Sequence, residues 1–332
     1  LAAFDRLKRS ELVEHIIVPR RPYREQLVAM NARPKVLGVF GGARGGKTQT
    51  LAEMAEDAWF ELGGKGVRFW WVAPELGDTI RAVTKLILGE AVRGGRYGET
   101  RPGLFHASLL ASYPGERNPD PDSVLEQVKR RKPIRMIDGS VIELRYAGRG
   151  GALGDTEAGS NKGGNLRGDA PAWIGVDEGA EIMSSSTWHI LIQRTTDSGG
   201  RLVTATTPKV GSPLKNLVYD AGKDLAANDG QYLTAYVHLS MLSNPWITPR
   251  NADTTIATLE LEPNGADLVA QDVHGKWLVP GARMWEHFDE EAHVVDWPRR
   301  DLVGFRIDGR ALVNITPIAA AAFFSGTPAR LD

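Results

Sequence analysis

The sequence predicts an α/β fold in which a mostly parallel sheet is flanked by helices. Three observations lead to this prediction. Apolar runs at 36–40 and 67–73 are each followed by a helical pattern, and this alternation is typical of parallel sheets with helices on their faces. A glycine-rich loop, 41–48, joins the first run to its helix. A later apolar run, 173–176, ends in two acidic residues.

Length and composition limit the classes to which the chain can belong. With 332 residues it can bury a large core, and the length suggests two domains or one large domain with an appendage. The absence of cysteine excludes disulfides, thiol nucleophiles and Cys-ligated metals. The net charge of −1 neither favours nor excludes nucleic acid, because basic residues can be kept local. Without an apolar run of about 18 residues or the apolar core of a signal peptide, a soluble intracellular protein is expected.

Residues 1–35 precede the first apolar run and begin with a predicted amphipathic helix. Tyr23 and Gln26 lie shortly before the glycine-rich loop. A Gln amide can both donate to and accept from the edge of adenine, so the pair is a candidate adenine site. A surface turn around a buried tyrosine explains the same residues equally well, and spacing alone does not separate the two interpretations.

The glycine-rich loop fits the pattern G-x-x-x-x-G-K-[ST] without a mismatch. Glycines let successive N–H groups turn inward, and the following helix adds its positive N-terminal end, so such a loop holds phosphate oxygens. Lys47 is then expected to reach the β- and γ-phosphates, and Thr48 to offer its hydroxyl to Mg²⁺. The other residues expected to line the phosphates are Gly41, Gly42, Ala43, Gly45 and Gly46. A chance match in a chain with 37 glycines is the alternative, but the flanking strand and helix disfavour it.

Several further segments carry local signals. The helical pattern after the loop ends at residues 63–64, and another begins near residue 80. Asp138-Gly139 between two apolar segments predicts a hairpin. The basic run 129–132 is either a nucleic-acid contact or a solvated helix end. The glycine-rich stretch 147–172 is long for a loop in a compact domain, which makes it either functional or disordered.

Asp177 and Glu178 follow the apolar run 173–176 directly. In a phosphate-loop protein the first acid holds Mg²⁺ against the phosphates, and the second can accept a proton from the attacking water. Acids are common at strand ends, so the pair alone is weak evidence. With the phosphate loop it predicts one site, because both are expected at the carboxyl ends of neighbouring strands.

The rest of the chain contains further strands and a helical segment. Thr206 and Thr207 end a strand at 201–208, where their hydroxyls either sense the γ-phosphate or mark a strand that leaves the sheet at Pro208. The segment 232–239 alternates, with Leu233, Ala235, Val237 and Leu239 predicted on one face. Residues 249–275 look helical, 279–303 suit a linker, and 303–309 look like a new strand.

These landmarks occur in a fixed order: Tyr23 and Gln26, GGARGGKT at 41–48, WVAP at 71–74, DGSVIEL at 138–144, NLRG at 165–168, WIGVDE at 173–178, TATTP at 204–208 and GKW at 275–277. Over roughly residues 20–310 this order resembles the large terminase subunit of tailed bacteriophages, the ATP-driven motor that packs viral DNA into procapsids. The loop and the acid pair are shared with many ATPases. Their order with LRG before the acids and TTP after them is more specific.

The resemblance implies a P-loop NTPase fold of the RecA/ASCE-like kind, with a small lid or linker subdomain, that hydrolyses ATP with Mg²⁺. It implies that Gln26 reads adenine, that Asp177 holds the metal and that Glu178 orients the attacking water. Thr206 and Thr207 match the motif that couples hydrolysis to movement. Arg167, in LRG, is similar to the arginine that such motors present to a neighbour's ATP, and Arg44 in the loop is a second candidate for stabilising charge.

An arginine supplied by a neighbour implies a ring, and the resemblance implies a pentamer docked on the portal protein of the procapsid. The other implied partners are double-stranded DNA and the small terminase subunit, and no membrane is implied. The implied location is the host cytoplasm, on the portal during packaging, and outside the mature virion.

The expected domains are an adenine-binding arm at 1–35, an ATPase core at 36–245, a lid or linker at 246–302, and the first strands of a ribonuclease-H-like nuclease at 303–332. Asp308 is the acid that resembles the nuclease domain's opening strand. Two-metal cleavage needs several carboxylates, so ATPase activity without nuclease activity is expected.

Two other classes compete with a packaging ATPase. Another nucleic-acid-stimulated ATPase, such as a helicase, should carry a second motor domain, and the residues after 250 are too few for one. A nucleotide-binding switch or scaffold without turnover does not need Glu178.

Overall fold

The computed structural model describes residues 22–62, 66–75, 77, 80, 109–111, 124, 126–128, 130, 132–147, 166, 170–196, 198–225, 227 and 232–278, and the backbone of 89–90, 101–102, 305–307 and 310–312. The chain divides into two compact units, Leu1–Leu278 and Val279–Asp332. In the second unit β11 (Phe305–Ile307) and β12 (Arg310–Leu312) pair antiparallel. The boundaries expected at 35/36, 245/246 and 302/303 stay predictions.

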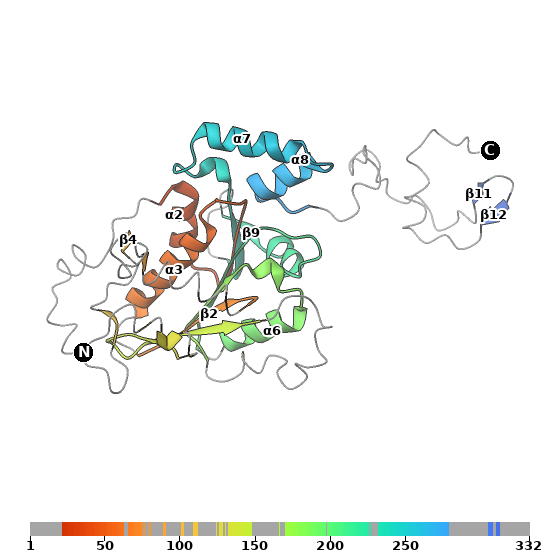
Figure 1. Cartoon of the computed structure of the whole chain (residues 1–332). Helices are drawn as coiled ribbons and strands as arrows, with labels where there is room; N and C mark the ends of the chain where they lie inside the picture. Colours follow the sequence, from red (N-terminus) through yellow and green to blue (C-terminus); the bar gives the residue numbers. More distant parts are fainter. Residues whose placement is uncertain are drawn as a thin grey trace. The chain divides into compact units, whose positions relative to one another are not determined.

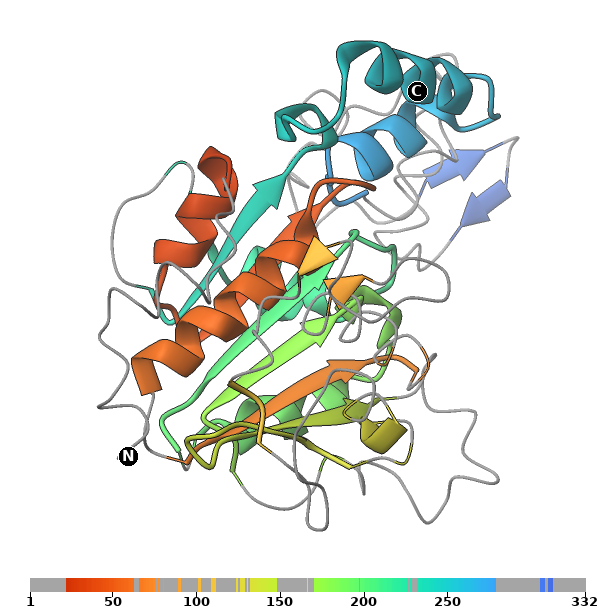
Figure 2. The same ribbon diagram turned by 60° about the vertical axis from the view of Figure 1, so that its left-hand side comes forward.

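The first unit is built around an eight-stranded sheet with the order β5-β6-β2-β7-β8-β1-β10-β9, seen from two sides in Figure 1 and Figure 2. Its strands are β1 (Val36–Gly41), β2 (Arg68–Ala73), β5 (Ile134–Arg135), β6 (Val141–Tyr146), β7 (Trp173–Asp177), β8 (Arg201–Thr206), β9 (Lys223–Asp224) and β10 (Thr234–Leu239). Every neighbouring pair is parallel except β5 and β6, which form the predicted hairpin. This arrangement confirms the predicted α/β class.

Helices cover both faces of the sheet, and further helices and short turns lie beyond one of its ends (Figure 1). The α-helices are α2 (Arg24–Asn31), α3 (Lys47–Leu62), α6 (Ser185–Arg194), α7 (Pro249–Glu260) and α8 (Gly265–Leu268). Short 3₁₀ turns are η4 (Gly179–Glu181) and η6 (Met241–Ser243), and π-helical turns are η5 (Lys215–Asp220) and η7 (Val269–Val273). Outside the sheet, β3 (Gly89–Glu90) and β4 (Arg101–Pro102) pair antiparallel.

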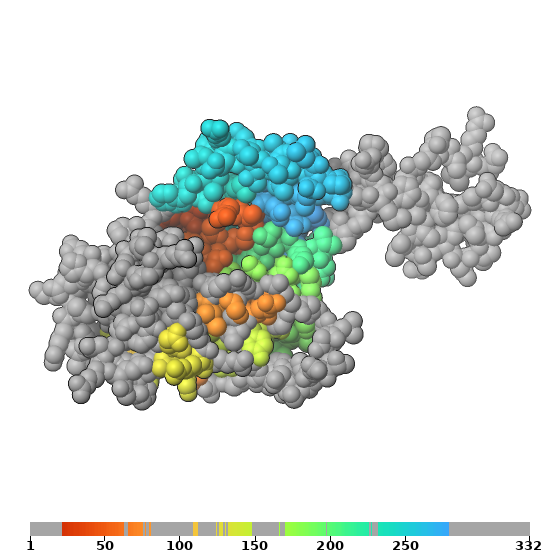
Figure 3. Space-filling view, in the orientation of Figure 1, coloured from red at the N-terminus to blue at the C-terminus, as the bar shows by residue number. Residues whose placement is uncertain are grey.

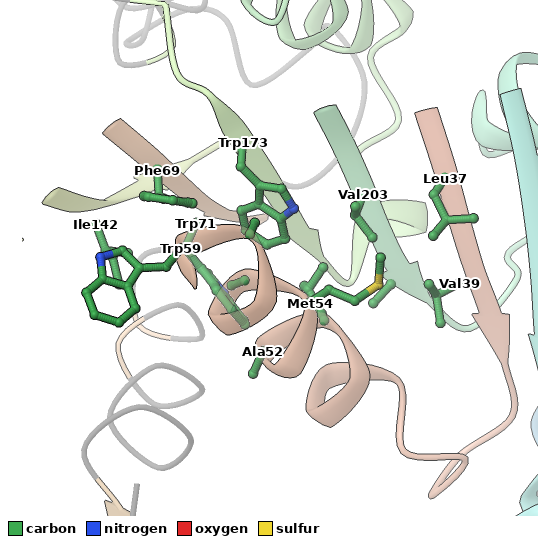
Figure 4. Packing of buried hydrophobic residues seen from close by; sticks show 14 of the residues in the cluster. Leu37, Val39, Ala52, Met54, Trp59, Phe69, Trp71, Ile142, Trp173 and Val203 are labelled. Atoms are coloured by element: carbon green, nitrogen blue, oxygen red, sulfur yellow. The ribbon is translucent and has the colours of Figure 1, made fainter. Parts of the chain in front are cut away.

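Hydrophobic side chains bury both faces of the sheet, because successive strand residues point to opposite sides. Figure 4 shows the face covered by α3, where Met54 and Trp59 lie among residues of several strands. On the opposite face, Trp188 and Leu191 of α6 belong to a second cluster with Phe40 of β1. Burial on both sides explains why β1 reads as a continuous apolar run.

Two local predictions were wrong. Leu233 precedes β10 instead of sharing its buried face, and its side chain is 76% exposed, whereas Ala235, Val237 and Leu239 are buried as predicted. The segment predicted as helical over 249–275 is interrupted between α7 and α8, where Pro263 lies. Proline has no N–H to donate and clashes with the carbonyl group four residues earlier, which kinks or ends a helix.

Several predicted segments lie outside the described residues. They are the helix near the N-terminus, most of the helical pattern after residue 80, part of the basic run 129–132 and most of the stretch 147–172. Within the described ranges, no helix combines the length and hydropathy that a membrane span requires.

Candidate active site

The glycine-rich loop connects β1 to α3, as predicted, and its glycines lie against backbone atoms from the end of the first unit. A Cβ atom on Gly41 would come within 2.4 Å of the Leu239 carbonyl oxygen, and one on Gly42 within 2.2 Å of the Asp272 carbonyl oxygen. Gly46 has φ +80°, which favours glycine. Only residues without side chains allow this close approach.

Backbone N–H groups at the start of α3 indicate an anion-binding site. Gly42 N donates to the Leu239 carbonyl at 3.2 Å, Ala43 N to the Asp272 carbonyl at 2.6 Å, and Gly45 N to the Gly42 carbonyl at 3.2 Å. In contrast, no described residue accepts a hydrogen bond from the N–H groups of Gly46, Lys47 or Thr48. Free donors at a helix N-terminus bind phosphate oxygens, so the loop fits a nucleotide's phosphates.

Lys47 lies over the loop that it belongs to. Its ammonium donates to the Gly42 carbonyl at 2.6 Å. Burial lowers the pKa of Lys47 to about 8, although the carboxylates of Asp177, Glu178 and Asp272 act in the opposite direction. Among the described residues this carbonyl is the hydrogen-bond partner of the half-buried ammonium, and phosphate oxygens would be stronger partners for it.

Thr48 and Asp177 meet, although 129 positions separate them in the chain. The Thr48 hydroxyl donates to Asp177 Oδ1 at 3.0 Å, and Glu178 N donates to the same oxygen at 3.2 Å. Asp177 is only 7% exposed, and burial raises its pKa to about 7, partly offset by the Thr48 hydrogen bond. A hydroxyl beside a buried carboxylate that favours a positive neighbour is a hard oxygen set that fits Mg²⁺. The described residues contain no group of three or more His, Cys, Asp or Glu side chains arranged to hold a metal ion. Mg²⁺ commonly uses one or two carboxylates with substrate phosphates instead.

Glu178 is exposed directly after the buried Asp177, in the left-handed region with φ +50°. Among the described residues, only Arg44 (φ +59°) and Glu178 are non-glycine residues with positive φ. Strained backbone of this kind concentrates at functional sites. Both strained residues belong to the predicted site.

The carboxyl ends of β1 and β7 lie on either side of a third strand, β8. We expected the phosphate-loop strand β1 and the acidic strand β7 to be neighbours, and this was wrong: β8 lies between them and pairs in parallel with both. The loop and the first turn of α3 reach across the end of β8 instead. Sequence separation carried no information about this insertion.

Thr206 and Thr207 lie at the end of this intervening strand. Thr206 is buried, accepts a hydrogen bond from Ala180 N at 3.0 Å and donates to the Thr207 carbonyl at 3.0 Å. Its hydroxyl therefore holds the turn that follows Glu178. Lys209 pairs with Glu181 of the same turn at 2.9 Å. Thr207 is half-buried.

Gln26 and Tyr23 lie beneath the loop. The Gln26 amide nitrogen donates to Thr50 Oγ1 at 2.9 Å and approaches the Gly46 carbonyl at 3.5 Å, while its oxygen accepts from Tyr23 N at 3.2 Å. The Tyr23 hydroxyl donates to the Gly45 carbonyl. The side chain of Gln26 is therefore buried and holds the underside of the loop. Its role in adenine recognition stays a prediction.

The two candidate arginines differ in what the structure describes. Arg44 is an exposed residue of the loop, and its carbonyl accepts a hydrogen bond from Asn244 Nδ2 at 2.6 Å. Arg167 lies outside the described residues. Its role as an arginine presented to a neighbour stays a prediction.

The sequence alone did not identify the segment after β10 as part of the site. The Asp272 carbonyl, Gly275 and Asn244 all hold the phosphate loop, and Gly275 (φ +68°) would place a Cβ 2.4 Å from Gly41 Cα. Figure 3 shows the cyan and blue segment from α7 onward packed against the red part of the chain, to which α2 belongs. The GKW sequence at 275–277 was the available signal, because a glycine there permits the contact.

Comparisons with known proteins find matches among solved structures. No protein-family model matches the sequence, and no curated protein matches it. The chain is similar in structure to the large terminase ATPase domain of Thermus phage P74-26, with 14% identity and a TM-score of 0.45, over 82% of this chain and 99% of that chain. It is also similar to the large terminase of a thermophilic bacteriophage, with 14% identity and a TM-score of 0.45, over 84% of this chain and 60% of that chain. A structure of the latter in complex with ATP-gamma-S matches with 14% identity and a TM-score of 0.47, over 82% of this chain and 57% of that chain.

Proposed function

We propose that this chain hydrolyses ATP with Mg²⁺ at the carboxyl ends of β1 and β7. The observation that carries the proposal is the 3.0 Å hydrogen bond from the Thr48 hydroxyl to Asp177 Oδ1, beside the free N–H groups of Gly46–Thr48. It joins a phosphate cradle to a carboxylate of a distant strand. A structural glycine turn has no need of a buried carboxylate at this place.

The residues of the site divide the work as follows. The N–H groups at the start of α3 hold phosphate oxygens, and the Lys47 ammonium moves from the Gly42 carbonyl to the phosphates. Thr48 and Asp177 would hold Mg²⁺, which neutralises the charge of the phosphates when bound. Glu178 is exposed at the edge of this cradle, where its carboxylate orients the attacking water and accepts a proton from it.

The finer proposal is a motor that moves double-stranded DNA into a viral procapsid. The order of LRG, WIGVDE and TTP along the chain supports it, as does the contact between Thr206 and the turn after Glu178. The alternative is another nucleic-acid-stimulated ATPase such as a helicase. Stimulation of phosphate release by blunt double-stranded DNA without strand separation is expected of the motor, whereas unwinding of a tailed duplex would favour the helicase.

Further parts of this proposal concern assembly. A pentameric ring on the portal protein, with the small terminase subunit as a partner in the host cytoplasm, would let Arg167 act on a neighbour's ATP. A particle mass that rises when an ATP analogue is added supports the ring. A mass that stays that of one chain with the analogue and with DNA removes the role of Arg167.

Steady-state phosphate release tests the hydrolysis directly. We expect Glu178→Ala to bind ATP and to release phosphate about 10²- to 10⁴-fold more slowly, the range for loss of a general base. Glu262→Ala, which removes an exposed acid after α7, is the matched control and should behave like the parent. Equal rates for the parent and Glu178→Ala would remove Glu178 from the assigned role.

A further inference from the structure

An exposed tryptophan, Trp246, lies next to the phosphate loop and takes no part in the proposed hydrolysis. Trp246 follows η6, and 76% of its surface is exposed. A single exposed apolar side chain is common and proves nothing by itself. The contacts of its backbone distinguish it from the other exposed apolar residues.

One side chain ties Trp246 to the loop. Asn244 Nδ2 donates to the Arg44 carbonyl at 2.6 Å, while Asn244 Oδ1 accepts from Trp246 N at 3.0 Å. The same amide therefore fixes both a loop residue and the tryptophan. Since two residues span at most about 7 Å, the Trp246 backbone is held beside the loop.

The turn that carries the tryptophan is rigid on both sides. Ile247 N donates to the Asn244 carbonyl at 3.0 Å, and Thr248 caps α7 by accepting from Asn251 N at 3.3 Å. Ser243 Oγ donates to Glu25 of α2 at 3.4 Å. The turn thus lies between α2 and the phosphate loop and is hydrogen-bonded to both.

The expected reader of the base edge, the Gln26 amide, is engaged by residues of the protein itself. The Gln26 amide, expected to contact adenine, already uses its oxygen and nitrogen on Tyr23 N, Thr50 and Gly46. A base bound beside the loop could gain contact energy by stacking as well as by hydrogen bonds. Stacking on an aromatic face needs no donor or acceptor.

We propose that Trp246 is the platform on which the purine base of ATP stacks while the phosphates occupy the loop. This inference rests on the proposed nucleotide site. A rigid aromatic ring loses little conformational entropy when a base covers it, and stacking tolerates any purine. The nucleotide covers apolar surface that is otherwise in water.

The test compares ATP with inorganic tripolyphosphate, which has the phosphates but no base. Dissociation constants of both, with Mg²⁺, are measured by calorimetry for the parent, Trp246→Ala and Trp246→Phe. Trp246→Ala should weaken ATP binding roughly 5- to 150-fold and leave tripolyphosphate binding unchanged, while Trp246→Phe retains most of the ATP affinity. Leu261→Ala, at an 86% exposed apolar residue beyond the far end of α7, is the control and should change neither.

Four results would overturn the inference. ATP affinity of Trp246→Ala equal to that of the parent means that the ring contacts something other than the base. Equal losses for ATP and tripolyphosphate mean that the substitution disturbs the loop, and equal affinity of the parent for both ligands means that the base makes no contact. A parent that binds neither ligand removes the proposed site as well, whereas a parent that binds ATP without turnover removes only the hydrolysis.

Discussion

Two threonines of β8 show how single hydroxyl groups differ in the core of the site. Thr206 and Thr204 are both buried, two positions apart. The Thr206 hydroxyl bonds Ala180 N and the Thr207 carbonyl, whereas no described residue pairs with the Thr204 hydroxyl. Removing the acceptor of a buried N–H costs more free energy than removing a hydroxyl that has no partner.

Replacing Thr206 by valine should therefore destabilise the protein and slow hydrolysis. Ala180 N loses its acceptor, which lowers the free energy of unfolding by about 1–3 kcal/mol and frees the turn after Glu178. Thr204→Val is the matched control and should be near neutral. Urea unfolding and phosphate release check both. Equal effects of the two substitutions would refute the role given to the Ala180 contact.

The lowered pKa of His238 should make the folded protein less stable in acid. Burial lowers its pKa, and Lys276 adds to this, while Asp224 and the Gly275 carbonyl act in the opposite direction. Below about pH 6.5 the unfolded chain then takes up a proton that the folded protein resists, so stability falls as the pH falls. Between pH 7 and 5 the free energy of unfolding should fall less for His238→Gln than for the parent. His189→Gln, at an exposed position, is the control, and a slope for His238→Gln as steep as the parent's would contradict this account.

At the scale of elements, the phosphate loop depends on a segment that follows β10. Gly275 has φ +68° and lies against Gly41, while Gly199 has φ +64° with nothing near its would-be Cβ. The two glycines share a left-handed backbone conformation, and only Gly275 also approaches another backbone closely. Substituting each by alanine therefore separates the cost of a left-handed backbone from the cost of a steric clash.

Gly199→Ala should cost about 1–2 kcal/mol of unfolding free energy, the penalty of a left-handed alanine. Gly275→Ala should cost more and should also weaken ATP binding, because the added methyl group displaces β1 or the loop. Urea unfolding and calorimetry measure the two quantities. If Gly275→Ala costs no more than Gly199→Ala, the loop does not rely on this contact.

Strands and the loop were predictable because their signals are local. Apolar runs buried on both faces gave β1, β2, β7 and β8, and the motif gave the loop between β1 and α3. The insertion of β8 between β1 and β7 was missed, since no local pattern encodes strand order. The bracing role of Gln26 was also missed, because its partner Thr50 follows the motif and is brought near only by the loop.

At the scale of the whole molecule, the fold of the first unit brings together segments that lie far apart in the sequence. The loop contacts the end of β7 through Thr48 and Asp177, and it contacts the segment after β10 through Asn244 and Asp272. The central claim is that the cradle of the loop and the carboxylate of Asp177 hold one Mg²⁺-nucleotide between them.

The affinity of ATP with Mg²⁺, divided by its affinity with the metal chelated, tests that claim most directly. The control is Asp272→Asn. Like Asp177, the Asp272 carboxylate raises the pKa of Lys47, but Thr48 donates its hydrogen bond to Asp177. Mg²⁺ should strengthen ATP binding to the parent and to this control, and Asp177→Asn should reduce that gain about 10- to 100-fold. A gain in Asp177→Asn as large as in the parent would contradict the claim.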